Sequence, residues 1–275
     1  MIEELVERRV GLIGCGAMAR ALAGGLLKAG LSADRIRASD PDPDQRAGFE
    51  TQLGLKPSAN NGEVVAASDI VVLAVKPAVI PLVLRDLGGD ADLARPLWIS
   101  IAAGVPLAAL AGALPEGSRI LRAMPNTPAL VGAGATALCA NPAADERDRA
   151  AGEALFRAVG SVWQAPEEPL LDAVTGLSGS GPAYVFRFLE ALAEAGVRAG
   201  LPGEVASELA LQTVYGAVVL ARESGKTPAQ LREQVTSPGG TTSAGLERLE
   251  AGGLASALVE AVAAATARSR ELGRR

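Results

Sequence analysis

A glycine-rich turn near the N-terminus has the residue types and spacing of a dinucleotide-binding loop. Gly14-Cys15-Gly16-Ala17-Met18-Ala19 fits G-x-G-x-x-A, directly after the apolar run 10–13 and before a stretch of helix formers. The first glycine permits a tight turn, the second lets a pyrophosphate approach the backbone, and the small third residue lets the helix pack on the strand. Free N–H groups at the helix N-terminus would hold the phosphates. The turn therefore predicts dinucleotide binding, with Cys15 as a packing residue.

A carboxylate stands where the second apolar run, residues 36–38, ends. Asp40 follows the glycine loop at the spacing where a carboxylate would contact the adenine ribose, favour NAD and repel a 2′-phosphate. Residues 39–43, Ser-Asp-Pro-Asp-Pro, are also ordinary turn chemistry. Arg37 and Arg46 lie close enough in sequence to serve a phosphate. The choice between NADH and NADPH stays open at this point.

Two further turns follow strand-like runs. The run 70–75 ends in Val75-Lys76-Pro77, and the run 119–123 leads into RAMPNTP at 122–128. Ligands bind outside the carboxyl ends of strands in open α/β sheets. Lys76 is therefore a candidate for contact with cofactor phosphate or ribose, although a surface lysine at a strand exit fits the position equally well.

Two segments rich in glycine and hydroxyl residues lie in the C-terminal part. Residues 176–182 are GLSGSGP, and residues 236–243 are TSPGGTTS, ahead of a helix expected at 244–249. Such a turn can cap its own helix or hold a small carboxylate on free amides and the helix dipole. Two adjacent glycines followed by three hydroxyl residues exceed what a cap requires, which favours anion binding.

Strands and helices alternate in the first half of the chain. Strand-length apolar runs separated by helix-sized intervals indicate a doubly wound parallel sheet. Residues 137–140, a helix at 145–159 and residues 161–163 are expected to extend it. The five runs are 10–13, 36–38, 70–75, 97–101 and 119–123.

Beyond Pro166 the strand-like runs disappear, and Ala, Leu, Glu and Arg dominate. The polar, proline-bracketed segment 164–169 marks the expected boundary between a Rossmann-like domain, residues 1–165, and an all-α domain, residues 166–275. Helices are expected at 182–199, 204–223 and 254–272.

Composition excludes several classes of site. With 26 basic and 31 acidic side chains the net charge is −5, unlike a nucleic-acid binder. The chain has no histidine, which excludes Ser-His-Asp and Cys-His catalysis and His-ligated metals. Two cysteines are too few for a disulfide framework or a four-cysteine metal site, so no metal is expected. Charged residues at 3–9 interrupt any signal peptide, and no apolar run reaches about 18 residues, so we expect a cytoplasmic protein without a membrane span.

Taken together, these segments resemble the pyrroline-5-carboxylate reductase family nearly end to end. Generic nucleotide-binding proteins have no reason to carry SGSGPAY and SPGGTT together. The resemblance implies NAD(P)H-dependent hydride transfer to the imine carbon of L-1-pyrroline-5-carboxylate, giving L-proline in the last step of proline biosynthesis. It also implies a helical dimerisation domain that interlocks with a second subunit, as a dimer or a ring of dimers. The segments that carry it are GCGAMA, VVLAVKP, SIAAGV, RAMPNTPA, DAVTGLSGSGPAY, QTVYGA, VTSPGGTTSAGL and ARSRELG.

The resemblance also assigns site residues. It implies that Gly240, Thr241 and Thr242 hold the substrate carboxylate through backbone N–H groups, with Ser180 as a further substrate contact. The Thr242 hydroxyl would lie near the ring nitrogen, where we expect it to orient the imine and relay a proton. Asp40 departs from relatives that carry a hydroxyl there, and Gln234 from relatives that carry asparagine. The implied cofactor contacts are Ile13, Gly14, Cys15, Gly16, Ala17, Met18, Ser39, Asp40, Asn61, Ala74, Val75, Lys76, Pro77, Ala102 and Ala103.

Imine reduction suits a chain without histidine, because a protonated cyclic imine is already a strong electrophile and chiefly needs orientation. Two alternatives remain. A β-hydroxyacid dehydrogenase has a similar plan but uses a catalytic lysine in its helical domain, whereas Lys226 is the only lysine after Lys76 and lies in a glycine-proline break. A dinucleotide-sensing regulatory protein would bind cofactor without turnover, and the intact SPGGTT segment argues against it.

Overall fold

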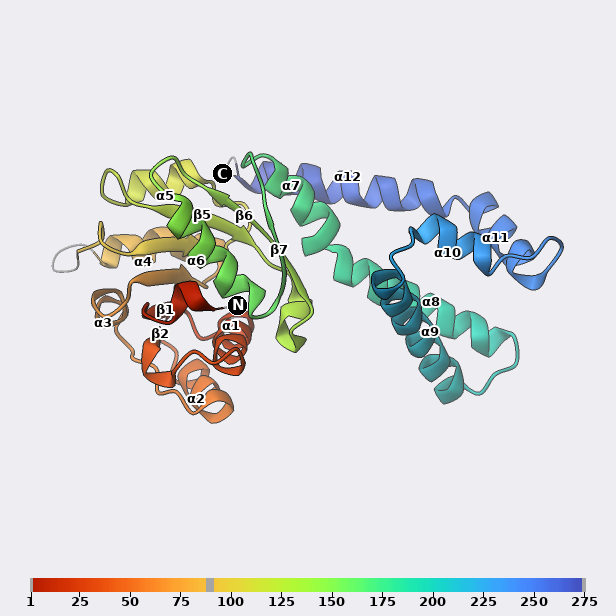
Figure 1. Ribbon diagram of the computed structural model, residues 1–275, viewed down its shortest axis with the longest axis horizontal. Helices are drawn as coiled ribbons and strands as arrows, with labels where there is room; N and C mark the ends of the chain where they lie inside the picture. Colours follow the sequence, from red (N-terminus) through yellow and green to blue (C-terminus); the bar gives the residue numbers. More distant parts are fainter. Residues whose placement is uncertain (1, 88–91, 274–275) are drawn as a thin grey trace. The chain divides into compact units, whose positions relative to one another are not determined.

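The chain folds into two compact units in the computed structural model, which describes residues 2–87 and 92–273 (Figure 1). The first unit comprises Met1–Ser180 together with Ala263–Arg275, and the second comprises Gly181–Val262. The division between the two units, after Ser180, lies later in the chain than the domain boundary predicted at 165/166. The predicted domain boundary stays a prediction.

The first unit is built on one seven-stranded sheet in the order β2-β1-β3-β4-β5-β6-β7. Strands β1 to β5 pair in parallel, which confirms the predicted doubly wound sheet. Strand β6 extends the sheet as expected but runs antiparallel to β5, and β7 is parallel to β6. The strands are β1 Val10–Ile13, β2 Ile36–Ser39, β3 Ile70–Leu73, β4 Leu97–Ser100, β5 Ile120–Met124, β6 Gly134–Ala140 and β7 Gly160–Gln164.

The direction of β6 follows from the short link before it. A parallel neighbour needs a crossover of a dozen or more residues, usually a helix. Only the short 3₁₀ helix η4, Thr127–Val131, lies between β5 and β6, so the chain turns back instead of crossing over.

Helices cover both faces of the sheet, because alternate strand residues point to opposite sides. Leu12 and Val72 belong to one buried cluster, whereas Ile13 and Leu73 belong to the other. All four residues of β1, β3 and β4 are buried, as in a strand covered on both faces. The helices are α1 Ala17–Lys28, α2 Pro43–Leu53, α3 Asn61–Ala66, α4 Ile80–Asp86, α5 Leu107–Ala113, α6 Glu146–Arg157 and α7 Leu170–Val174, with short 3₁₀ turns η1 Glu3–Leu5, η2 Ala33–Arg35 and η3 Pro77–Val79.

The remaining helices agree with the helical pattern predicted beyond residue 166. The helix expected at 244–249 begins earlier, at Thr241, so the three hydroxyl residues form its first turn rather than a loop before it. A short helix at Pro228–Gln234 was not predicted; Thr227 caps it in a reciprocal box with Gln230. These helices are α8 Gly181–Arg198, α9 Gly203–Glu223, α10 Pro228–Gln234, α11 Thr241–Ala251 and α12 Leu254–Gly273.

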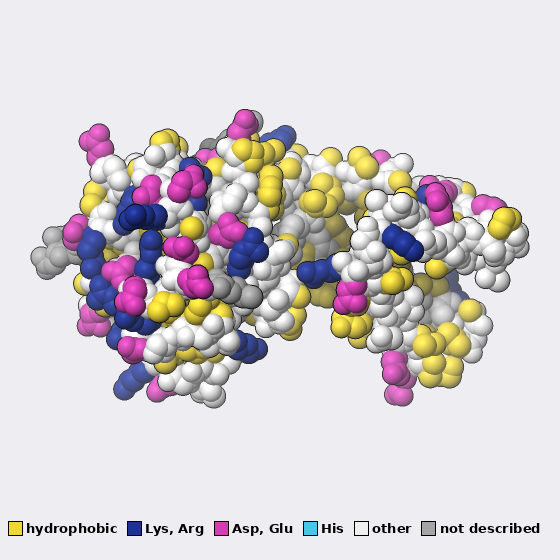
Figure 2. All heavy atoms as spheres, in the orientation of Figure 1, with side chains coloured by type: hydrophobic (Ala, Val, Ile, Leu, Met, Phe, Trp, Pro, Cys, Tyr) yellow, Lys and Arg dark blue, Asp and Glu magenta, His cyan; other side chains and the backbone are white. Residues whose placement is uncertain are grey.

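The second unit leaves many large apolar side chains in solvent. On α8 and α9, Phe186, Leu211 and Tyr215 are about 60% exposed (59%, 60% and 63%), and apolar side chains lie open near these helices in Figure 2. Within the described residues, α9 is long and apolar enough to span a membrane by length and composition, and the bent pair α11 and α12 passes the same test together. Exposed apolar surface of this extent is typical of an interface with another protein or with a membrane.

Candidate functional site

The carboxyl ends of four parallel strands meet at one edge of the sheet in the first unit. Ile13 lies beside both Ser39 and Leu73, and Leu73 lies beside Ser100. Backbone bonds continue across the edge, from Gly14 N–H to the Ser39 carbonyl at 2.7 Å. The predicted cofactor residues from β1, β2, β3 and β4 therefore line the same edge.

The glycine loop has the geometry that a bound pyrophosphate requires. Gly14 has a φ of 104°, and a Cβ there would lie 2.6 Å from the carbonyl oxygen of Ala74. Only glycine fits such a position without strain. Gly16 precedes α1, and a Cβ on it would meet no described atom within 4 Å. No side chain caps α1, and the space beside Gly16 is open, so the first N–H groups of that helix suit an anion.

Asp40 is fixed against the glycine loop. Its Oδ2 accepts a hydrogen bond from Cys15 N–H at 2.9 Å, and its Oδ1 accepts one from Asp42 N–H at 2.9 Å. Cys15 itself is fully buried, and this burial, together with the Asp40 carboxylate, raises the pKa of its thiol to about 12. A thiol of that pKa is protonated near neutral pH, so Cys15 is a packing residue as predicted and not a nucleophile.

Ser39 and Asn61 form a pair at the end of β2. Ser39 is 0% exposed, and its hydroxyl donates to the Asn61 side-chain oxygen at 2.8 Å. The Ser39 hydroxyl is therefore engaged inside the protein, whereas Asn61 is half-buried at the start of α3. Of the two predicted contacts, Asn61 presents the more accessible side chain.

The turns after β3 and β4 complete this edge. Strand β3 ends at Leu73, so Val75 lies in the turn rather than in the strand expected at 70–75. Lys76 is exposed directly before η3, where a flexible cation can reach a phosphate. Ala102 is buried and Ala103 is half-buried, so they offer mainly backbone groups.

The two motifs RAMPNTP and GLSGSGP are joined within the first unit. The Asn126 side-chain amide donates to the Ser178 carbonyl and hydroxyl oxygens, each at 3.2 Å, while its oxygen accepts from Ala135 N–H at 2.8 Å. Ser178 lies in a π-helical turn, Thr175–Gly179, which connects α7 to α8. Such turns are rare and frequent at functional sites. Ser180 closes this turn by donating its N–H to the Thr175 carbonyl at 2.8 Å.

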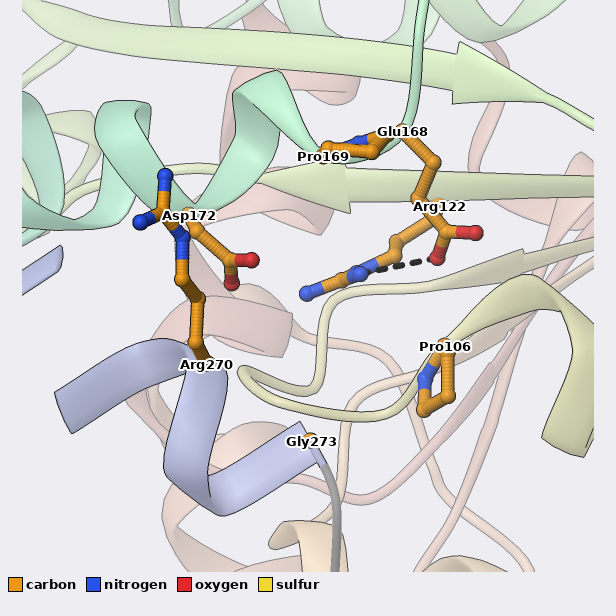
Figure 3. Close-up of a pocket in the computed structure, with 7 residues that line it drawn as sticks. All are labelled: Pro106, Arg122, Glu168, Pro169, Asp172, Arg270 and Gly273. Carbon is orange, nitrogen blue, oxygen red and sulfur yellow. Dashed lines mark hydrogen bonds and ion pairs between the residues drawn. The ribbon is translucent and has the colours of Figure 1, made fainter. Parts of the chain in front are cut away.

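A pocket of about 330 Å³ lies beside α7 and is lined by an ion pair between the buried Arg122 and the half-buried Glu168, which was not predicted from the sequence (Figure 3). The Arg122 guanidinium, 7% exposed, is 2.8 Å from the Glu168 carboxylate, which also accepts from Leu107 N–H at 2.8 Å. An arginine inside an otherwise apolar strand requires such a partner, and this was the signal available. Glu168 belongs to the segment predicted as an interdomain joint, which is therefore anchored to β5.

The turn before α11 lies in the second unit. Gly239 has a φ of 69°, and Gly240 N–H donates to the Ser237 carbonyl at 3.0 Å, which makes a tight turn. Gly240 then precedes α11 without a side chain to cap it. Thr241 and Thr242 are both exposed in the first helical turn. Their N–H groups and the helix dipole suit a small carboxylate.

No metal centre accompanies these residues in the described part of the chain. Among residues 2–87 and 92–273, no three His, Cys, Asp or Glu side chains are grouped so that they could hold a metal ion. The chemistry on offer is therefore backbone N–H groups, hydroxyls and a few charged side chains.

Comparison with known proteins divides the chain in two. Residues 9–104 match the family model described as NADP oxidoreductase, coenzyme F420-dependent. Residues 168–272 match the family model described as pyrroline-5-carboxylate reductase dimerisation. The first match covers the glycine loop, and the second covers the turn before α11.

Several relatives that match nearly the whole chain are pyrroline-5-carboxylate reductases. The pyrroline-5-carboxylate reductase of Synechocystis is 47% identical over 268 residues, 97% of this chain and 99% of the relative. That of Escherichia coli is 39% identical over 270 residues, 98% of this chain and 100% of the relative. Among solved structures, a pyrroline-5-carboxylate reductase from Coxiella burnetii matches with a TM-score of 0.89 and 40% identity, covering 96% of this chain and 98% of that one. The pyrroline carboxylate reductase of Plasmodium falciparum, solved with NADP bound, matches with a TM-score of 0.86 and 33% identity, covering 98% and 99%.

Proposed function

Because the chain belongs to the pyrroline-5-carboxylate reductase family, we propose that the sheet edge and the turn before α11 carry out the reaction of that family. The protein is an NAD(P)H-dependent oxidoreductase that reduces the cyclic C=N bond of L-1-pyrroline-5-carboxylate to give L-proline, the last step of proline biosynthesis.

The cofactor is held at the carboxyl edge of the sheet. A bound nicotinamide dinucleotide supplies hydride for the imine carbon. The uncapped N-terminus of α1 binds the pyrophosphate through backbone N–H groups, and Gly16 leaves room for it. Asp40 and Asn61 contact the adenosine end, and Lys76 adds a cation to the phosphates. Ala74, Val75, Pro77, Ala102 and Ala103 contribute backbone around the nicotinamide end.

The substrate carboxylate binds at the N-terminus of α11. Thr241 and Thr242 direct backbone N–H groups at it, and the positive end of the helix dipole adds to the attraction. The Gly240 N–H donates to the Ser237 carbonyl in this structure, so Gly240 contributes the tight turn that precedes the helix. Ser180, at the end of the π-helical turn, is a further contact. Holding the carboxylate fixes the ring, and orientation is what a hydride acceptor chiefly needs.

Thr242 orients the ring nitrogen and relays its proton. The protein contains no histidine, and a cyclic imine is basic enough to be protonated without a strong protein acid. A neutral, exposed hydroxyl on the first turn of α11 suits this task. The test compares Thr242→Ser with Thr242→Val and Thr242→Ala. We expect Thr242→Ser to retain most of kcat, and the other two to lose roughly tenfold to a hundredfold. Full activity in both of the latter would refute the role.

The observation that carries this proposal is the uncapped, open N-terminus of α1 at the edge where four strands end. The direct test follows the oxidation of NADH and NADPH by the purified protein with L-1-pyrroline-5-carboxylate, in parallel. Rapid oxidation with proline formation supports the reductase. Cofactor binding without turnover would reject it in favour of the sensing alternative.

The protein self-associates through the second unit, which matches the dimerisation model. The apolar side chains on α8 and α9 are covered by a second copy rather than by lipid, and we propose that dimers assemble further into a ring. Light scattering coupled to size exclusion would measure the mass. A plain dimer at micromolar concentration would refute the ring, and partition of the protein into membranes would refute the packing.

We also place the enzyme in the cytoplasm. Both cysteines, Cys15 and Cys139, are free and buried, as is usual where thiols stay reduced. Fractionation of the source cells tests this, and recovery outside the cytoplasm would refute it.

A further inference from the structure

We propose that the adenosine end of the cofactor site is built for an unmodified ribose, so that the protein prefers NADH to NADPH, with Asp40 as the residue that decides. This inference rests on the proposed cofactor site and specifies which of two cofactors the site selects.

The Asp40 carboxylate is held in place by the loop that binds the pyrophosphate. Cys15 N–H donates to one oxygen at 2.9 Å, and Asp42 N–H donates to the other at 2.9 Å. Each oxygen keeps a second lone pair that can accept a bond from a ribose hydroxyl. Because the bond from Cys15 ties the carboxylate to the glycine loop itself, Asp40 cannot swing away without disturbing that loop.

A 2′-phosphate has nothing to gain from this carboxylate. It brings close to two negative charges and oxygens that only accept hydrogen bonds, so Asp40 repels it. Asp42, the N-cap of α2, and Asp44, in the first turn of that helix, are both exposed and add to the negative charge. Like charges placed together select strongly against the wrong ligand.

The Ser39 hydroxyl and Arg46, two donors beside Asp40, make hydrogen bonds within the protein, and the exposed Arg37 donates its Nη1 to the Ile36 carbonyl at 3.1 Å. The Ser39 hydroxyl is buried and donates to Asn61. The Arg46 Nη1 donates to the backbone carbonyls of Asp40 and Pro41, at 2.7 and 2.9 Å. These contacts fix the backbone of the acidic turn, so the Arg46 guanidinium stabilises the position of Asp40.

The same pattern holds on α1. The Arg20 Nη2 donates to the Gln45 side-chain oxygen at 3.0 Å, which ties α1 to α2. Arg20 and Arg46 therefore link parts of the unit to one another, and the Asp40 carboxylate is the group that the turn presents to the ribose.

The experiment measures binding and turnover separately with the full-length protein. Calorimetry compares 5′-AMP with adenosine 2′,5′-bisphosphate, and steady-state kinetics compares kcat/KM for NADH and NADPH. We expect the wild type to favour the unmodified nucleotide and NADH by at least about tenfold. Asp40→Asn removes the charge and keeps an amide oxygen for Cys15 N–H. It should reduce the preference for 5′-AMP over the bisphosphate and the preference for NADH over NADPH in kcat/KM, each by roughly tenfold and the latter mainly through KM. Asp40→Ser provides a second variant.

Asp44→Asn is the matched control. It removes one charge from the first turn of α2, where the Asp44 side chain is exposed to screening by solvent and salt. The preference for 5′-AMP and the preference for NADH should therefore each change by less than about twofold. Equal or tighter binding of the bisphosphate by the wild type would overturn the inference, as would an equal effect of Asp44→Asn. Selective binding of 5′-AMP without any reduction of the imine would reject the proposed function and leave the selectivity standing.

Discussion

Removing the Glu168 carboxylate should destabilise the first unit more than removing any exposed carboxylate nearby. Arg122 is 7% exposed on the interior strand β5, and Glu168 is its partner at 2.8 Å. Loss of one member of a buried pair typically costs 3–5 kcal/mol, because the remaining charge stays buried without compensation. Water in the pocket of Figure 3 can partly solvate Arg122, so we expect the lower end, about 3 kcal/mol, for Glu168→Ala.

The size of the effect can be followed by thermal unfolding. In a chain of this size about 1 kcal/mol corresponds to roughly 2 °C, so Glu168→Ala should lower Tm by roughly 6 °C. Glu168→Gln keeps an acceptor for Arg122 and for Leu107 N–H and should lower it by about half as much. Glu167→Ala, at an exposed neighbour, serves as the matched control. Protomer concentration must be fixed, because the protein self-associates.

A double variant separates the ion pair from other effects of Glu168. In Arg122→Met with Glu168→Ala no charge is left buried, so the pair of changes should cost less than Glu168→Ala alone. Equal Tm values for Glu168→Ala and Glu167→Ala would refute the reasoning, because the buried arginine would then need no partner.

Three further predictions follow from the first unit. Gly14→Ala should abolish dinucleotide binding and lower Tm, because the φ of Gly14 and the nearby Ala74 carbonyl exclude a Cβ. Gly16→Ala should fold normally and weaken NADH binding roughly tenfold in titrations. Cys15, with a thiol pKa of about 12, should resist alkylation at pH 8 in the native enzyme and react only on unfolding, as mass spectrometry would show; rapid native labelling contradicts this. The Arg9 guanidinium donates hydrogen bonds to the Asp69 carboxylate and lowers the pKa of that carboxyl, so ionised Asp69 stabilises the fold above the ordinary carboxyl pKa and loses this effect as pH falls. The Tm of Asp69→Asn should therefore lie below that of the wild type at pH 7, and the difference should shrink below about pH 4. A difference in Tm that does not change with pH would argue against this role of Asp69.

The sequence predicted β1, β3 and β4 well because these strands are buried on both faces. Runs such as 70–75 stand out as unbroken apolar segments, and the glycine loop has a spacing that few other structures need. The direction of β6 could not be predicted from its own residues, since it depends on how the short link through η4 turns back.

Side-chain pairing across long stretches of sequence was the other limit. Glu168 was interpreted as a polar joint residue because its partner, Arg122, lies on a distant strand. Ser39 stays a predicted cofactor contact, but the sequence did not show that its hydroxyl would point at Asn61. Local pattern gives the residue type at a position, whereas the direction of each side chain follows from neighbours that only the fold brings together.

Helix α12 begins in the second unit and ends in the first, where Ser269 donates to Asp172 at 2.7 Å and the Leu272 side chain lies beside Gly104. The second unit is thus an insertion held by two covalent connections, and a single proteolytic cut in either one would not release it. During synthesis the first unit is completed only when residues 263–273 have been made. Its sheet can form early on the ribosome, but its final contacts become available only after the helices of the inserted unit have been made.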